Sequence, residues 1–134
     1  MFAIQLSAIP APQLSYYINI TDAQLSRQLW DRLPANSLVF DRQPSRSVTL
    51  FGQPTVAFED VYKPLPQWSK LVNNPNPDTI AQAGYAFVYV DRDWWEQMTS
   101  DQHAAFQQPC VKTFAQQVPA DGDFRRLLDV RTCK

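Results

Sequence analysis

The stretch NPDTIAQAGYAFVYVD, residues 76 to 91, joins a short helix signal directly to a strongly apolar run. Asn76 is a good helix cap, Pro77 suits the first helical position, and Gly84 suits the left-handed residue that follows a helix. The apolar run after Gly84 has almost no polar alternation, which is typical of a strand that is buried on both faces of a parallel sheet. We therefore expect an α/β fold built around this strand.

The preceding segments supply a partner for that strand. TDAQLSRQLWDRLP, residues 21 to 34, predicts a helix in which Thr21 and Gln24 form a capping box and apolar residues recur at helical spacing. The short apolar run SLVFD, residues 37 to 41, follows it. Because a helix separates this run from residues 85–91, we expect the two strands to pair in parallel as part of a βαβ unit.

The last third of the chain predicts two short helices and a hairpin. In RDWWEQM, Asp93 and Glu96 match a capping box, and Thr99 begins the next helix. The segments CVKTFAQQV, residues 110–118, and FRRLLDVRTC, residues 124–133, then read as strands on either side of the turn sequence PADGD. We expect a mixed sheet with parallel central strands, flanking helices and a C-terminal antiparallel hairpin.

Length and composition favour a single α/β domain over residues 1–134. Residues 1–14 are expected to be an extended N-terminal segment, and residues 53–75 a long Pro-rich loop. A net charge of −1 gives no positive electrostatic potential that would attract nucleic acid. The three glycines are isolated and cannot build a phosphate-binding loop. No apolar run is long enough to span a membrane. We also expect no bound cofactor.

The two cysteines can form a disulfide. Cys110 begins the first hairpin strand and Cys133 ends the second, so a turn centred on residues 121–122 sets them opposite each other. The same register sets Lys112 against Arg131, which is unfavourable unless a bulge intervenes. Two buried free thiols are the alternative. A disulfide would indicate an oxidising compartment.

Two strand ends share the sequence Asp-Arg, at Asp41-Arg42 and at Asp91-Arg92. If the strands are parallel, both pairs emerge at the edge where open α/β sheets bind ligands. The acids could then perform acid–base chemistry or hold a divalent cation. Alternatively, they are helix caps and arginine partners. Asp91 and Asp93 also match the DxD pattern of sugar-nucleotide transferases, although Asp93 has a competing role as a cap.

The remaining candidates are aromatic. Trp68, in the Pro-rich loop, is a candidate platform for a sugar ring, with core packing as the alternative. Trp94 and Trp95 are adjacent on a helix, so we expect one to pack and the other to lie at a boundary. His103 is the single histidine and has no metal-binding motif around it, so we expect a solvated helix residue and no metal site.

Taken in order, several segments resemble a known class of domain. These segments are LWDRLPANSLVFDR, SRSVTLFGQPTV, AGYAFVYVDRDWW, PCVKTF and FRRLLDV. Together they resemble the soluble C-terminal, extracytoplasmic domains of bacterial polytopic membrane glycosyltransferases of type C, which are similar to dolichyl-phosphate-mannose mannosyltransferases. The resemblance covers residues 20 to 133, and it transfers no catalytic residue, because in such proteins the catalytic acid belongs to the transmembrane part.

The resemblance implies a non-catalytic accessory domain on the extracytoplasmic face of a bacterial membrane. Such a domain would position a glycan or lipid-linked acceptor, or contact partner proteins, including the transmembrane part of its own parent protein. Two alternatives remain: a freestanding small hydrolase or transferase that uses Asp41 and Asp91, and a pure protein-interaction module. The candidate ligand-binding residues are Asp41, Arg42, Trp68, Asp91, Arg92 and Trp95.

Overall fold

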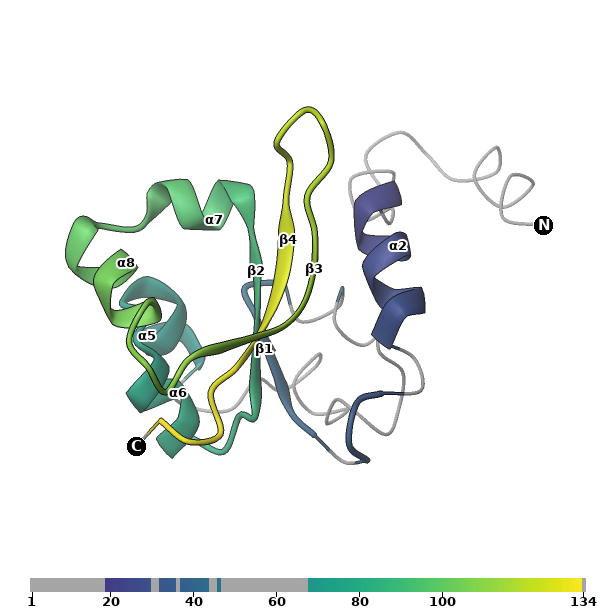
Figure 1. Cartoon of the computed structure of the whole chain (residues 1–134). Helices are drawn as coiled ribbons and strands as arrows, with labels where there is room; N and C mark the ends of the chain where they lie inside the picture. Colours follow the sequence, from purple (N-terminus) through teal and green to yellow (C-terminus); the bar gives the residue numbers. More distant parts are fainter. Residues whose placement is uncertain (1–18, 30–31, 36, 44–45, 47–67, 134) are drawn as a thin grey trace.

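The computed structural model describes residues 19–29, 32–35, 37–43, 46 and 68–133 (Figure 1). Its elements are α2 (Ile20–Leu29), β1 (Val39–Asp41), α5 (Trp68–Asn73), α6 (Pro77–Gln82), β2 (Phe87–Asp91), α7 (Arg92–Gln97), α8 (Ser100–Phe106), β3 (Lys112–Gln117) and β4 (Arg125–Asp129). The predicted N-terminal segment and most of the predicted Pro-rich loop lie outside the described residues.

The strands form one mixed sheet in the order β1-β2-β4-β3. β1 pairs with β2 in parallel, whereas β2–β4 and β4–β3 are antiparallel. The predicted α/β class, the parallel pair and the C-terminal hairpin are therefore confirmed. Within this sheet the parallel pair occupies one side, because β4 returns to lie beside β2.

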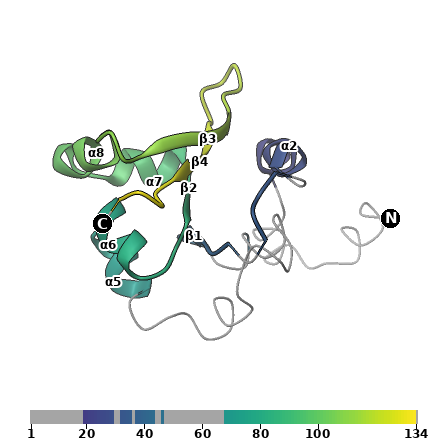
Figure 2. The same ribbon diagram turned by 60° about the horizontal axis from the view of Figure 1, so that its bottom comes forward.

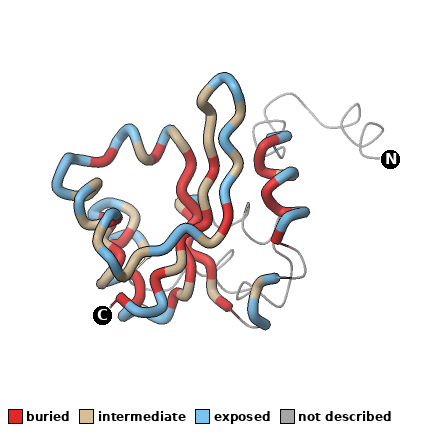
Figure 3. The backbone as a smooth tube through the Cα atoms, viewed as in Figure 1, coloured by how far each residue is buried: buried red, intermediate tan, exposed pale blue. Residues whose placement is uncertain are grey.

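Helices cover both faces of the sheet (Figure 2). Side chains alternate along β2, so Val88 and Val90 join the core beneath α5, α6, α7 and α8, whereas Phe87 and Tyr89 join the core beneath α2. Every residue of β2 is buried, and burial concentrates in β1, β2 and β4 and on the inner side of α2, whereas β3 is mostly exposed or half-buried (Figure 3). The continuous apolar run is thus explained by burial on both faces.

The connection from α6 to β2 forms as the sequence predicts. The Asn76 side-chain oxygen accepts hydrogen bonds from the backbone N–H groups of Asp78 at 2.8 Å and Thr79 at 3.4 Å. Pro77 is the first helical residue. Gly84 follows the helix with a φ of +103°, a conformation that residues with a Cβ rarely adopt.

Two predicted helix caps are wrong by two residues each. The side chain of Asn19, rather than that of Thr21, begins α2, accepting from the Thr21 backbone N–H at 2.7 Å. Asp91, rather than Asp93, caps α7, because β2 passes into the helix without a linker. Asp93 lies exposed in the first turn instead. The start of α8 at Thr99 is confirmed, with hydrogen bonds in both directions of a capping box.

A β-bulge in the hairpin corrects the predicted register. Pairing shifts between Thr113 and Ala115, so Lys112 lies opposite Asp129. The predicted opposition of Lys112 and Arg131 is therefore wrong: pairing near the turn is already one residue away from the predicted register, and the bulge shifts it by one more, which sets the lysine against an acid. Arg131 itself forms an ion pair with Asp129 at 2.7 Å.

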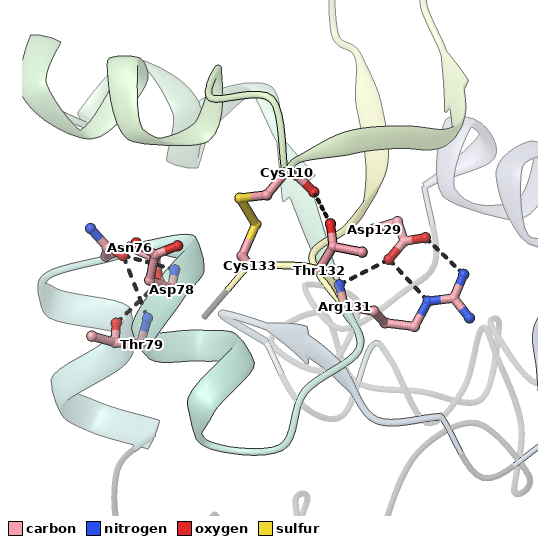
Figure 4. Close-up of a disulfide and its surroundings, with 8 residues drawn as sticks. All are labelled: Asn76, Asp78, Thr79, Cys110, Asp129, Arg131, Thr132 and Cys133. Carbon is pink, nitrogen blue, oxygen red and sulfur yellow. Dashed lines mark hydrogen bonds and ion pairs between the residues drawn. A yellow bond between two sulfur atoms is a disulfide. The ribbon is translucent and has the colours of Figure 1, made fainter.

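A disulfide joins Cys110 to Cys133, with Cα atoms 5.1 Å apart (Figure 4). Neither cysteine is free, so the predicted bond is confirmed and the free-thiol alternative is wrong. Beside it, the Thr132 hydroxyl donates to the Cys110 carbonyl oxygen at 3.1 Å. The bond fastens the end of the hairpin to the segment that follows α8. Within the described residues, no helix has the length and apolar character needed to cross a membrane.

We expect reduction of the disulfide to lower the free energy of unfolding by about 3 kcal/mol, because the bond closes a loop of 23 residues and restricts the unfolded chain. Urea denaturation with and without reductant measures the difference. The double variant Cys110→Ser/Cys133→Ser is the control and should be insensitive to reductant. Equal stability of the oxidised and reduced chains would contradict the prediction.

Candidate functional site

The carboxyl ends of β1 and β2 bring Asp41 and Asp91 together. Both side chains are almost fully buried, with exposed fractions of 0% and 3%. Between them lies Arg46, whose Nη2 atom is 2.5 Å from Asp41 Oδ1 and 3.0 Å from Asp91 Oδ2. Parallel pairing therefore places the two predicted acids at one edge of the sheet, but a guanidinium group occupies the space between them.

Each acid has additional partners. Arg42 binds Asp91 through two parallel hydrogen bonds, from Nε to Oδ2 at 3.0 Å and from Nη2 to Oδ1 at 3.2 Å. Asp41 accepts from Arg46 Nε at 2.8 Å and from the backbone N–H of Gln43 at 3.0 Å. This paired geometry is the strongest form of arginine–carboxylate contact.

The network continues across the sheet to α2. The Arg46 guanidinium carbon lies 4.9 Å from the centre of the Tyr89 ring, and the Tyr89 hydroxyl donates to Asp22 Oδ1 at 2.6 Å. Arg125 Nε donates to the same oxygen of Asp22 at 2.8 Å, and its Nη1 donates to Asp123 at 2.6 Å. Charged groups on four elements or their adjoining loops thus form one connected cluster, the acid–arginine network.

The surroundings of Asp91 hold it in the ionised form. Burial favours the neutral carboxyl, but hydrogen bonds from Arg42 and from the Trp94 backbone, together with the charge of Arg46, outweigh it and lower the pKa of Asp91 below its ordinary value. A general acid or base works best when its pKa lies near the operating pH. Asp91 is therefore poorly suited to exchange protons at neutral pH.

Two other members of the network are fixed in one charge state. Burial opposes the charge of Arg46, but Asp41 and Asp91 outweigh it and raise the pKa of the guanidinium. Burial, followed by the charge of Asp22, raises the pKa of Tyr89 well above its ordinary value, so the phenol keeps its proton. At neutral pH, this arrangement stabilises fixed charges rather than moving a proton.

These contacts bear on two roles that the sequence left open for the acids, namely binding of a divalent cation and the DxD pattern. Arg46 supplies between Asp41 and Asp91 the positive charge that a metal ion would otherwise provide. Asp91 also accepts the α7 backbone hydrogen bond, whereas Asp93 is exposed, so the two acids of the DxD pattern have different roles. Paired arginines and a helix cap are the arrangement expected of a structural network.

A second cluster of ligand types lies at the disulfide. Among the described residues, a carboxylate oxygen of Asp78 and the sulfur atoms of Cys110 and Cys133 lie within 4.8 Å of one another. The sulfur atoms are joined to each other, and a metal binds thiolates rather than disulfide sulfurs. In this oxidised form the cluster offers only one carboxylate as a ligand.

The other predicted site residues, Trp68, Arg92 and Trp95, lie outside the acid–arginine network. Trp68 is half-buried against Phe40 in the core beneath α5 to α8, and its Nε1–H donates to the Asp41 backbone carbonyl oxygen at 3.2 Å, so it packs at the sheet rather than forming an exposed platform. Arg92 instead pairs with Glu96 at 3.1 Å on the surface of α7. It also donates to the Asp121 carbonyl oxygen in the hairpin turn, at 3.2 Å.

Trp95 lies away from the acids and stacks on His103. The ring centres are 4.1 Å apart and the planes 15° from parallel, while His103 Nε2 lies 2.6 Å from the Trp95 carbonyl oxygen. The expectation of a solvated histidine is therefore wrong, because the ring is half-buried against the tryptophan. Trp94 is buried and Trp95 half-buried, as predicted for adjacent helical tryptophans.

Beside Trp95 is a hollow of about 390 Å³, which lies on the α7 and α8 side of the β3–β4 hairpin. Its volume falls in the range typical of ligand pockets, roughly 300–1,000 Å³. Its lining is formed by Val90, Trp95, Phe106, Gln107, Val111, Thr113, Gln116, Arg126 and Leu128.

The sequence did not reveal the hollow or half of the network. The residues of the hollow come from five elements and the loops between them, and they share no local pattern. Asp22 did carry a signal, since it lies at helical spacing from the buried Leu25 and Leu29 and therefore points inward. Arg46 carried none, because nothing in the turn sequence DRQPSR shows which acids it will meet.

We expect Arg46→Met to destabilise the fold by about 3–5 kcal/mol, because it leaves two buried carboxylates facing each other without a counter-charge. Urea denaturation measures the loss. Arg92→Met is the matched control: it removes an arginine from an exposed ion pair, and it should change stability little. An Arg46→Met variant as stable as the control would show that the network does not hold the sheet edge together.

The lowered pKa of Asp91 makes stability depend on pH. Because the folded pKa lies below the ordinary value of 3.8, the stabilisation is fully present above that value and is lost as pH falls through the lowered folded pKa. We expect the free energy of unfolding to fall between about pH 5 and about pH 2. In Asp91→Asn this fall should be shallower, starting from a lower stability at neutral pH; an unchanged slope would contradict the assignment.

Comparison with known proteins finds no matching family model, no similar curated protein and no similar solved structure. The proposal below therefore rests on the contacts and charges described above and on the resemblance in the sequence.

Proposed function

We propose that this domain is a non-catalytic accessory domain on the extracytoplasmic face of a bacterial membrane, belonging to a glycosyltransferase-like membrane protein. Its role is to position a glycan or lipid-linked acceptor for the transmembrane part of the parent protein. The observation that carries the non-catalytic role is the neutralisation of Asp41 and Asp91 by arginines, whereas the parent protein and its location are taken from the sequence resemblance. The acids best placed for chemistry are occupied in holding the fold, which favours binding over conversion.

The disulfide supports the extracytoplasmic location. Disulfides persist in oxidising compartments and are rare in reducing ones. The bond between Cys110 and Cys133 joins the segment between α8 and β3 to the segment that follows β4, so a reducing compartment would remove a cross-link from the fold. An oxidising location is compatible with this bond, and it agrees with the location that the sequence resemblance implies.

The distribution of polar groups supports a binding role. Bound sugars contact flat aromatic rings through their C–H faces and amide or guanidinium groups through their hydroxyls. The hollow beside Trp95 offers both kinds of group, with an aromatic wall and side chains of glutamine, threonine and arginine. Trp68 packs against Phe40 and does not line the hollow, so Trp95 is the better of the two predicted tryptophans for this role.

The test combines binding and turnover by the whole chain. The oxidised protein is applied to an array of bacterial surface glycans and to vesicles that contain polyprenyl-phosphate sugars, and both are analysed for reaction products. We expect retained binding and no product. Arg27→Gln, an exposed change on α2, is a control that should bind as the wild type does.

Two outcomes would overturn this proposal. Product formation that Asp41→Asn abolishes would assign the paired-acid enzyme instead. Binding to the isolated transmembrane part of the parent protein, with no binding to any glycan or lipid-linked sugar, would assign a protein-interaction module.

A further inference from the structure

The hollow beside Trp95 has an apolar floor and one flat aromatic wall. Val90, Phe106 and Leu128 line it from the buried core, and Trp95 lines it from α7. Because Trp95 is stacked on His103, its indole ring is held in one orientation before any ligand arrives. A pre-oriented ring binds without the entropic cost of ordering a side chain. This wall suits the C–H face of a sugar ring.

Arg126 is also fixed in place. Its Nε donates to Gln116 Oε1 at 3.1 Å, and its guanidinium carbon lies 4.2 Å from the centre of the Phe124 ring. These two contacts hold the group while leaving its terminal nitrogens as donors. Planar guanidinium groups bind carboxylate and phosphate oxygens in pairs of hydrogen bonds.

Among the described residues, no acid neutralises the positive charge that Arg126 brings to the hollow. Arg42, Arg46 and Arg125 all pair with carboxylates, whereas Arg126 forms no ion pair with any residue that the structure describes. Among the described residues that line the hollow, Arg126 is the only charged one, and no acid accompanies it. The hollow therefore attracts an anionic group and disfavours a cationic one.

The rim supplies hydrogen-bonding groups for hydroxyls. Gln107, Thr113 and Gln116 are exposed and line the hollow, so their donors and acceptors are reachable from solvent. A bare phosphate ion would use Arg126 and leave the indole wall and the apolar floor without a partner. A ligand that uses all three parts is a polar ring bearing an acid.

We propose that this hollow binds a sugar ring that carries an anionic group, either a carboxylate or a phosphate ester. The ring lies against Trp95, the anion pairs with Arg126, and the hydroxyls meet the amide and hydroxyl groups of the rim. The inference rests on the proposed function and deepens it, because it names the class of glycan and the residues that bind it.

The test is a titration of the isotope-labelled whole chain, followed by NMR amide shifts, with three probes: glucuronic acid, glucose 1-phosphate and glucose. We expect both anionic sugars to shift residues around the hollow and to bind more tightly than glucose. Arg126→Gln should weaken binding of the anionic sugars by roughly 10- to 100-fold, the range expected for losing a charge-assisted hydrogen bond, and should change glucose binding little. Arg27→Gln makes the same change of charge outside the hollow and should leave every affinity unchanged.

Trp95→Phe provides a second arm, because phenylalanine keeps an aromatic ring but offers a smaller surface for stacking. We expect weaker binding of all three sugars, with the preference for anions retained. Thermal unfolding of each variant confirms that the loss of binding is not a loss of fold. The two variants thus separate the aromatic contact from the charge contact.

Each outcome has a distinct meaning. Anionic sugars that bind with unchanged affinity to Arg126→Gln, or that shift residues around Trp68 instead, would overturn this inference and leave the proposed function standing. Equal affinity of the wild type for glucose and glucuronic acid would also overturn it. Failure of the wild type to bind these probes, combined with glycan capture on the array, likewise overturns the inference alone. Product formation in the titration would overturn the proposed function itself.

Discussion

The ion pairs that Arg46 forms with Asp41 and Asp91 determine how this end of the sheet is built. Two carboxylates buried at adjacent strand ends would repel each other strongly in a medium of low polarity. The guanidinium between them turns that repulsion into two attractions, and the second guanidinium of Arg42 completes the pairing of Asp91. The parallel register of β1 and β2 is then held by charge at one end as well as by backbone hydrogen bonds.

The same interaction connects the layers. The Arg46 guanidinium lies over the Tyr89 ring, and the Tyr89 hydroxyl donates to Asp22 on α2. Polar contacts therefore hold α2 against the sheet in addition to its apolar face. Asp22 also receives Arg125 from β4, which makes one buried acid the meeting point of a helix and two strands. Removing one residue of such a cluster leaves its buried partners without a hydrogen bond or counter-charge, which destabilises the fold.

Patterns among neighbouring residues predicted the helix cap, the glycine turn and the buried strand of this fold. The cap at Asn76, the glycine at position 84 and the buried run of β2 follow from neighbouring residues, and they form as expected. Contacts between side chains that are far apart in the sequence could not be predicted in this way. Asp91 caps α7 because the strand reaches the helix without a linker, and the hairpin bulge sets Lys112 against Asp129. Both depend on backbone geometry that the order of residues does not specify, and so does the convergence of five elements on the hollow.

Strand β2 separates the two polar regions by the alternation of its side chains. Tyr89 belongs to the α2 face and takes part in the network, whereas Val90 belongs to the opposite face and lines the hollow. Acids and arginines satisfy one another in the network, but Arg126 meets no acid among the described residues of the hollow. Charge that is neutralised internally stabilises a fold, and charge left without a counterpart at a concave surface is available to a ligand. The Asp-Arg strand ends, which first suggest an active site, thus supply rigidity, and the binding potential lies across the sheet from them.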